Sequence, residues 1–188
     1  HLAPYVLGLV LLHNRDLFLL RALEGKQRQC AILDVALVID ALCADGPLRV
    51  THVGGAGLTL ARWVNHVRDG SPQIVLEPDA ALTDAVRREL PLPRGHRIRV
   101  RPVDGLTGVA ALRDASADVV VLDAYADGQV PAELGTVEWF AELRRVLAPG
   151  GLVLANVADE PGMRYAARVA AGAREALGHV AFVGLHEV

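Results

Sequence analysis

The chain has 188 residues, of which 52% are hydrophobic, and its formal net charge is −3. This length supports one sizeable core, so we expect one main domain with at most a small appendage. The absence of a Lys/Arg run argues against nucleic-acid binding, two cysteines without a Cys-x-x-Cys pair argue against a disulfide framework, and scattered histidines argue against a metal site.

Residues 1–30 predict a small N-terminal β-hairpin. Two apolar runs, Tyr5–Leu12 and Leu17–Leu23, are separated by the turn-prone sequence His-Asn-Arg-Asp. Neither run is long enough to span a bilayer, so we expect no membrane partner. We interpret the two cysteines as reduced, which favours a cytoplasmic protein. A hairpin of this kind leaves an apolar face and unpaired edges open, which favours a homodimer through this region. The chain begins at His1 rather than Met, which leaves a fragment or a tag remnant open as alternatives.

Residues 31–188 predict a single domain in which helices and strands alternate. The predicted helices are Ala31–Leu42, Leu58–Val67, Ala80–Leu90, Thr107–Arg113, Thr136–Leu147 and Met163–Leu177. The predicted strands are Arg49–Val53, Gln73–Glu77, Arg97–Arg101, Asp118–Asp123, Leu152–Val157 and His179–Val183. Repeated strand–helix units favour right-handed crossovers, so the expected class is α/β, with a Rossmann-like, doubly wound and mainly parallel sheet.

A glycine-rich turn follows the first of these strands. Gly54, Gly55 and Gly57 lie between the strand and the next helix, where ligands of doubly wound sheets bind. Glycines there allow positive φ and let a ligand approach the N–H groups at a helix N-terminus. A pure packing role is the alternative. The turn is neither Gly-x-Gly-x-x-Gly nor a Gly-Lys-[Ser/Thr] loop, which argues against NAD and ATP.

Acidic residues end the next two strands. Glu77, followed by Pro78, can accept hydrogen bonds from both hydroxyls of a ribose. Asp104, followed by Gly105, can accept a hydrogen bond from an adenine amino group. Helix capping is the alternative for both carboxylates. Together with the glycine turn, these residues predict a bound nucleoside.

The sequence Asp123-Ala-Tyr-Ala-Asp127 carries the candidate chemistry. Asp123 ends the most apolar strand, and Tyr125 and Asp127 follow it. A carboxylate at this edge can orient and deprotonate an attacking amine. Cation binding and capping of the loop are the alternatives for Asp123.

The order and spacing of several motifs resemble those of the spermidine synthase-like family, which are polyamine aminopropyltransferases with the class I S-adenosylmethionine methyltransferase fold. The matching segments are Val53–Gly57, Glu77, Asp104-Gly105, Val121–Asp123, Pro131–Leu134, Trp139-Phe140 and Leu147–Gly151. The resemblance covers about residues 48–183, and the family's small β domain fits the N-terminal hairpin.

The resemblance implies a function for each matched position. The glycine turn would cradle the methionine-derived end of decarboxylated S-adenosylmethionine, Glu77 would bind the ribose and Asp104 the adenine. Asp123 would lie beside a small-molecule amine acceptor. The amine would attack the aminopropyl carbon next to the sulfonium, and methylthioadenosine would leave.

Two positions differ from the family's usual pattern. The family's turn is usually Gly-Gly-Gly-Asp-Gly, whereas no acidic residue occurs in residues 51–65 here. The family's Asp-x-x-Asp-Pro reads Asp123-Ala-Tyr-Ala126, with Asp127 one position later. An S-adenosylmethionine-dependent methyltransferase and a non-catalytic nucleoside-binding homologue therefore stay open as alternatives.

Overall fold

The computed structural model describes residues 5–12, 39–40, 43, 45–125, 130–159 and 163–183. Within this part, strands form one sheet in the order β4-β3-β2-β5-β6-β1-β7. The strands are β1 (Tyr5–Leu12), β2 (Val50–Val53), β3 (Gln73–Leu76), β4 (Ile98–Arg101), β5 (Ala117–Leu122), β6 (Leu147–Asp159) and β7 (Ala181–Val183). The five strands from β4 to β6 run parallel, which confirms the predicted α/β class with a mainly parallel sheet.

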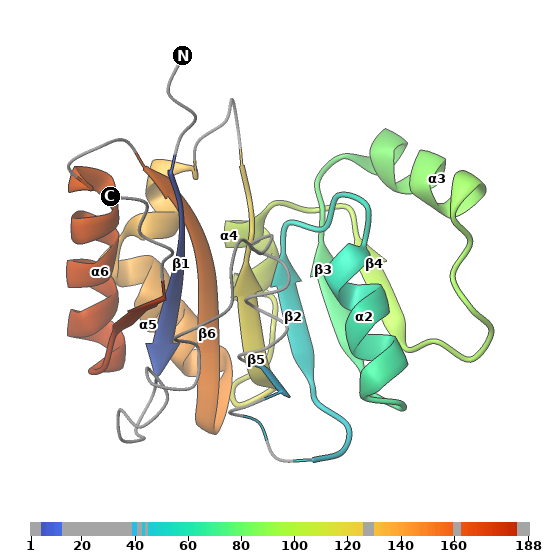
Figure 1. Ribbon diagram of the computed structural model, residues 1–188, viewed down its shortest axis with the longest axis horizontal. Coiled ribbons are helices and arrows are strands. Elements are labelled where there is room, and N and C mark those ends of the chain that lie inside the picture. Colours follow the sequence, from blue (N-terminus) through green and yellow to red (C-terminus); the bar gives the residue numbers. More distant parts are fainter. Residues whose placement is uncertain are drawn as a thin grey trace.

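Helices cover both faces of this sheet. They are α2 (Thr59–Val67), α3 (Ala80–Glu89), α4 (Gly105–Ala110), α5 (Val137–Val146) and α6 (Arg164–Leu177), with a short 3-10 turn, η1 (Ala132–Gly135). In Figure 1, α2 lies in front of the sheet, and α4 and α5 lie behind it.

The largest core cluster lies between the sheet and the layer formed by α4, α5 and α6. Its two largest side chains, Trp139 and Phe140, project from α5 and are at most 2% exposed. On the opposite face, Val64 of α2 packs with Val119 and Val121 of β5. Burial of each such side chain contributes about 1.5–3 kcal/mol. Because β5 is covered on both faces, its sequence is almost entirely apolar, and this pattern predicts a central strand.

Helix α4 and strand β6 depart furthest from their predicted bounds. Helix α4 begins at Gly105 instead of Thr107, because the Asp104 carboxylate accepts a hydrogen bond from the Thr107 N–H at 2.9 Å and so starts the helix earlier. Strand β6 begins at Leu147 instead of Leu152, so it includes the Ala-Pro-Gly-Gly sequence that separates the predicted helix from the predicted strand. The register between β5 and β6 shifts at this point, so an irregularity in the sheet accommodates these residues.

Strand β1 is where predicted, but its pairing differs from that of an appended hairpin. It lies between β6 and β7 in the main sheet and runs antiparallel to both. A continuous apolar run fits beside any open strand of suitable length, so the sequence alone does not choose its partner. The expected hairpin partner, Leu17–Leu23, and most of the predicted helix Ala31–Leu42 lie outside the described residues. The domain boundary near residue 30 stays a prediction.

The described helices include none that is both long enough and apolar enough to cross a membrane. Across the same residues, no cluster of three or more His, Cys, Asp or Glu side chains is arranged to hold a metal ion.

Candidate nucleoside site at the carboxyl edge of the sheet

The glycine turn connects the end of β2 to the start of α2, and two of its glycines lie very close to neighbouring atoms. Gly54 has a φ of +88°, and a Cβ built on it would lie 2.3 Å from the carbonyl oxygen of Asp123. A Cβ on Gly55 would lie 2.3 Å from a methyl carbon of Val75. Both positions therefore require glycine. Any Cβ would clash with the backbone after β5 at position 54 and with a side chain of β3 at position 55. Gly57 has no such contact, since its nearest neighbour would lie 3.6 Å away.

The left-handed residues of the turn are not all glycines. Ala56 and Leu58 have φ values of 35° and 59°, a conformation that costs a residue with a side chain about 1–2 kcal/mol. The Leu58 side chain is 3% exposed and packs with Ala61 and Val75, which offsets that cost. No side chain caps α2, whose N-cap is Leu58. The first N–H groups of α2 are thus without a capping side chain at the turn.

Glu77 is bound to this turn. One oxygen of its carboxylate accepts hydrogen bonds from the N–H groups of Gly55 and Ala56, each at 3.0 Å. The other oxygen accepts from the N–H of Asp79 at 3.0 Å. An ionised carboxylate offers about four acceptor sites, so three backbone bonds leave room for further hydrogen bonds. The carboxylate therefore fixes the turn and is still able to bind a hydroxyl group.

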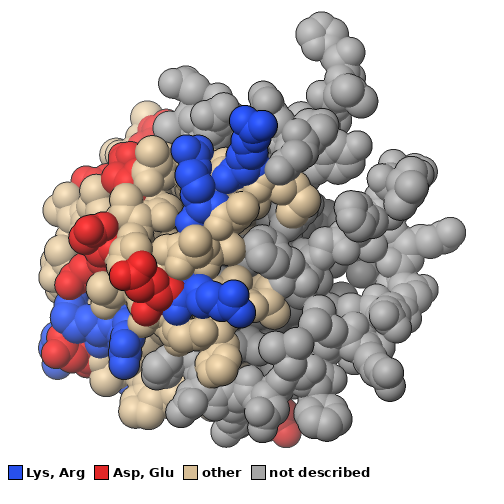
Figure 2. All heavy atoms as spheres, turned by 90° about the vertical axis from the view of Figure 1, so that its left-hand side faces the viewer, with Lys and Arg blue, Asp and Glu red and all other residues tan. Residues whose placement is uncertain are grey.

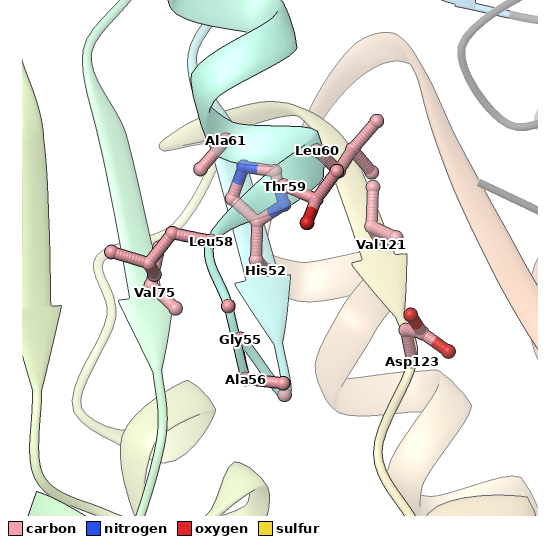
Figure 3. Close-up of a pocket in the computed structure, with 12 residues that line it drawn as sticks. His52, Gly55, Ala56, Leu58, Thr59, Leu60, Ala61, Val75, Val121 and Asp123 are labelled. Carbon is pink, nitrogen blue, oxygen red and sulfur yellow. The ribbon is translucent and has the colours of Figure 1, made fainter. Parts of the chain in front are cut away.

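A cavity of about 80 Å³ lies against the turn, and Gly54, Gly55, Gly57 and Asp123 all line it. These are four of the residues that the sequence selects. Figure 3 shows Asp123 at the end of β5, across from the turn, with the His52 ring on β2 near Thr59. The cavity is too small for a whole nucleoside, so it can take only one end of a ligand.

Asp123 belongs to a polar network at the ends of β5 and β6. The side-chain N–H of Asn156 donates a hydrogen bond to a carboxylate oxygen of Asp123 at 2.9 Å. The Tyr125 hydroxyl donates to the backbone carbonyl of Asn156 at 3.1 Å. The side-chain oxygen of Asn156 is buried and has no hydrogen-bond partner among the described residues. Asp127, the third candidate for catalysis, lies outside the described residues.

Asn156 has a role that sequence reasoning did not assign. The sequence places it at a strand end, but only the folded chain shows that its amide holds Asp123 and leaves a buried oxygen unpaired. A buried acceptor without a partner costs about 1–3 kcal/mol. In the sheet, Asn156 lies opposite Gly8 of β1.

Asp104 caps α4 and lies at the carboxyl end of β4. Its two oxygens accept from the N–H and the hydroxyl of Thr107, at 2.9 and 2.8 Å, and these bonds lower the pKa of the carboxyl. Gly105 is packed so tightly that an added Cβ would lie 2.6 Å from Val53. Pro78 is exposed, next to Glu77. The capping role of Asp104 leaves its outer lone pairs available to a ligand.

His52 is the second residue that the sequence did not single out. Its ring is 3% exposed and hydrogen-bonds to the side-chain oxygen of Gln73 at 2.9 Å, while the Gln73 amide donates to the carbonyl of Ala61. Burial lowers the pKa of the His52 imidazole to about 4, although the Gln73 bond acts in the opposite direction. A neutral His52 thus supports the floor of the cavity.

We expect His52 to make folding stability depend on pH. Below about 6.5 the unfolded chain binds a proton that the native ring does not accept until about pH 4. The free energy of unfolding should therefore fall as the pH drops through this window, by about 3 kcal/mol in total. Urea unfolding at several pH values measures this dependence. His52→Gln should show a smaller decrease, and an identical decrease in both proteins would contradict the assignment.

Removal of the Glu77 charge should loosen the turn. Glu77→Gln keeps the size of the side chain but replaces one acceptor oxygen with a donor, so one of the three backbone bonds is lost. We expect the free energy of unfolding to fall by about 1–3 kcal/mol. Asp79→Asn is the matched control, since asparagine caps a helix as well as aspartate does. Equal urea midpoints for Glu77→Gln and Asp79→Asn would show that the hydrogen bonds accepted by Glu77 do not stabilise the fold.

Comparison with known proteins gives both sequence and structural relatives. No family model matches the chain. The sequence is 31% identical over 133 residues to a polyamine aminopropyltransferase of Prochlorococcus marinus (strain MIT 9313), covering 67% of this chain and 46% of that protein. The chain thus spans less than half the length of this relative.

Two solved structures share the fold. A probable spermidine synthase from Corynebacterium glutamicum superposes with a TM-score of 0.71 and 36% identity, over 77% of this chain and 52% of that one. Human methyltransferase-like protein 13, in complex with SAH, gives a TM-score of 0.69 and 20% identity, over 84% and 83% of the two chains. The chain therefore belongs to the spermidine synthase-like family, with a class I methyltransferase-type fold.

Proposed function

We propose that the chain binds a nucleoside of the S-adenosylmethionine type and transfers an aminopropyl group from the decarboxylated form to a small amine. The observation that carries this proposal is the attachment of Glu77 to the glycine turn, beside a cavity that Asp123 also lines. The relationship to a polyamine aminopropyltransferase supports it.

The ligand would extend along the carboxyl edge of the sheet. The adenine would lie near Asp104, the ribose hydroxyls would reach the remaining acceptor sites of Glu77, and the sulfur-bearing tail would enter the cavity beside Gly54. The acceptor amine would approach from the side of Asp123, Tyr125 and Asn156. Apart from Asn156, which lies within β6, these groups follow the ends of parallel strands, where doubly wound sheets bind their ligands.

The proposed reaction is one in-line displacement. The nitrogen lone pair of a neutral amine forms a bond to the aminopropyl carbon, the carbon–sulfur bond breaks, and its electron pair leaves with methylthioadenosine. The new ammonium group then loses one proton. Asp123 would orient the amine and accept that proton, while the site supplies mainly alignment because the sulfonium is already activated.

A methyl transfer from S-adenosylmethionine itself is the second candidate. Among the described residues that line the cavity, Asp123 is the one carboxylate, and the turn lacks the Asp that polyamine synthases usually carry. A donor that keeps its own carboxylate would thus meet less repulsion here. A non-catalytic homologue is the third reading, and turnover that disappears in Asp123→Asn would exclude it.

Isothermal titration calorimetry with both donors distinguishes the first two candidates. The aminopropyl-transfer proposal predicts tighter binding of decarboxylated S-adenosylmethionine than of S-adenosylmethionine, because Asp123 attracts the cationic tail and repels a carboxylate. Tighter binding of S-adenosylmethionine would favour methyl transfer. The failure of both donors and of methylthioadenosine to bind would reject the nucleoside site itself.

The assembly and location that the sequence predicts, a homodimer in the cytoplasm, are part of the same proposal. The edges of β1 are paired with β6 and β7, so β1 does not supply the open edge on which the dimer was predicted. The other predicted strand of that region, Leu17–Leu23, lies outside the described residues, so the dimer stays a prediction, and light scattering measures the mass directly.

A further inference from the structure

A second concave surface lies mainly toward the amino ends of the strands. It is a groove of about 630 Å³, lined by the first residues of β2 and β3, by β4 as far as its last residue, Arg101, and by the segment that follows α4. Helix α4 has six residues, the shortest of the α-helices described, so it covers only part of this sheet face. The groove is thus separate from the glycine turn, which follows the carboxyl end of β2.

The groove is lined by basic side chains. They are Arg49, His96, Arg97, Arg99, Arg101 and Arg113, and none of the described lining residues is an Asp or a Glu. Arg99 and Arg101 alternate along β4, so their side chains project from the same face of the sheet, and Arg97 comes directly before the strand. The net charge of the chain is −3, so this concentration of positive charge is local. On the α6 side of the molecule, by contrast, Figure 2 shows basic and acidic side chains interspersed.

Three of these guanidinium groups are available to a ligand. Arg49 forms a salt bridge with Asp118, and Arg97 donates a hydrogen bond to the carbonyl of Gly70. The side chains of Arg99, Arg101 and Arg113 make no ion pair or hydrogen bond with the part of the chain that the structure describes. Three like charges around one groove repel each other unless an anion lies between them.

We propose that this groove binds a small anion that carries two or more phosphate groups. Guanidinium groups bind phosphate oxygens through paired hydrogen bonds, and three of them match a multiply charged anion better than a single carboxylate. A volume near 630 Å³ is in the range of small-molecule sites. Ile74 and Leu112 add apolar surface, so a nucleotide and a free polyphosphate share the chemistry that the groove recognises.

The test uses inorganic tripolyphosphate, which has no nucleoside and therefore does not compete for the glycine turn. Calorimetry on the full chain at about 0.15 M salt should show saturable binding at one site. The double variant Arg99→Gln/Arg101→Gln should bind at least about ten-fold more weakly for each guanidinium removed. Arg87→Gln, an exposed arginine on α3, is the matched control and should bind like the unmodified chain.

The other measurements identify which kind of phosphate compound binds, and they include the results that would overturn the proposal. If ATP competes more strongly than tripolyphosphate itself, while adenosine does not compete, the ligand is a nucleotide. If the nucleoside of ATP adds no affinity, the ligand is a free polyphosphate. Binding of methylthioadenosine should stay the same in the double variant, which shows that the fold and the nucleoside site are intact. An absence of tripolyphosphate binding, equal affinity in the double variant, or much tighter binding of a single-stranded RNA oligonucleotide would each overturn the proposal.

Discussion

Gly54→Ala should abolish nucleoside binding and lower the free energy of unfolding by about 3 kcal/mol or more. The new Cβ would lie 2.3 Å from the carbonyl oxygen of Asp123, and backbone cannot move aside as a flexible side chain can. The φ of +88° adds about 1–2 kcal/mol of strain for any residue with a Cβ. The turn and the end of β5 would have to separate, which takes apart the cavity between them. Urea unfolding and methylthioadenosine titration measure the two effects.

Two alanine variants separate the contributions to this effect. Gly57→Ala changes the same turn where an added Cβ would make only an ordinary contact at 3.6 Å, so binding should persist. Gly46→Ala has a φ of +101° and no atom within 4 Å of the added Cβ, so it should show the backbone strain without the clash. If Gly54→Ala bound methylthioadenosine as well as Gly57→Ala does, the close approach of turn and strand would not be part of the site.

Asp123→Asn should lower turnover by about 10²–10⁴-fold, which is the range for loss of a general base, and leave the fold intact. Asparagine has the same shape, and its oxygen can still accept the hydrogen bond that Asn156 donates to Asp123 at 2.9 Å. Only the negative charge that orients and deprotonates the amine is removed. Initial rates of methylthioadenosine release measure the change. Affinity for methylthioadenosine, which has no aminopropyl ammonium, should change by less than about three-fold.

Asn156→Ala tests the side chain that holds Asp123 in place. It removes the donor to Asp123 but keeps the carboxylate, so Asn156 acts as a positioning residue and its loss should cost less turnover than Asp123→Asn. A raised KM for the amine with a smaller change in kcat is the expected pattern. Equal kcat in Asp123→Asn and in the unmodified chain would remove Asp123 from the mechanism.

Much of the fold follows from patterns that are local in the sequence. Strand β5 is recognisable because Ala117–Leu122 is apolar on both faces, as a central parallel strand requires. Amphipathic helices such as α5 bury one side and expose charges on the other. Strand β1 shows the limit of this reasoning. Its apolar residues predict a strand, but its position between β6 and β7 depends on partner strands that are 140 or more residues away in the chain.

The candidate site likewise has residues that the sequence predicts and contacts that it does not predict. Gly54, Gly55 and Glu77 could be selected from the sequence, because parallel strands bring their carboxyl ends to one edge of the sheet. The hydrogen bond between Asn156 and Asp123, and the burial of His52 with Gln73, depend on side-chain orientations in neighbouring strands. No spacing rule in the sequence encodes those orientations, so these contacts became visible only in the folded chain.

Release of methylthioadenosine from decarboxylated S-adenosylmethionine tests the central claim most directly. The full chain would be incubated with that donor and a panel of diamines and polyamines, and the nucleoside product separated and quantified. We predict release with at least one amine, in equal amount to the aminopropylated product, and loss of this release in Asp123→Asn. No release with any amine, alongside methyl transfer from S-adenosylmethionine to one of them, would contradict the proposed function.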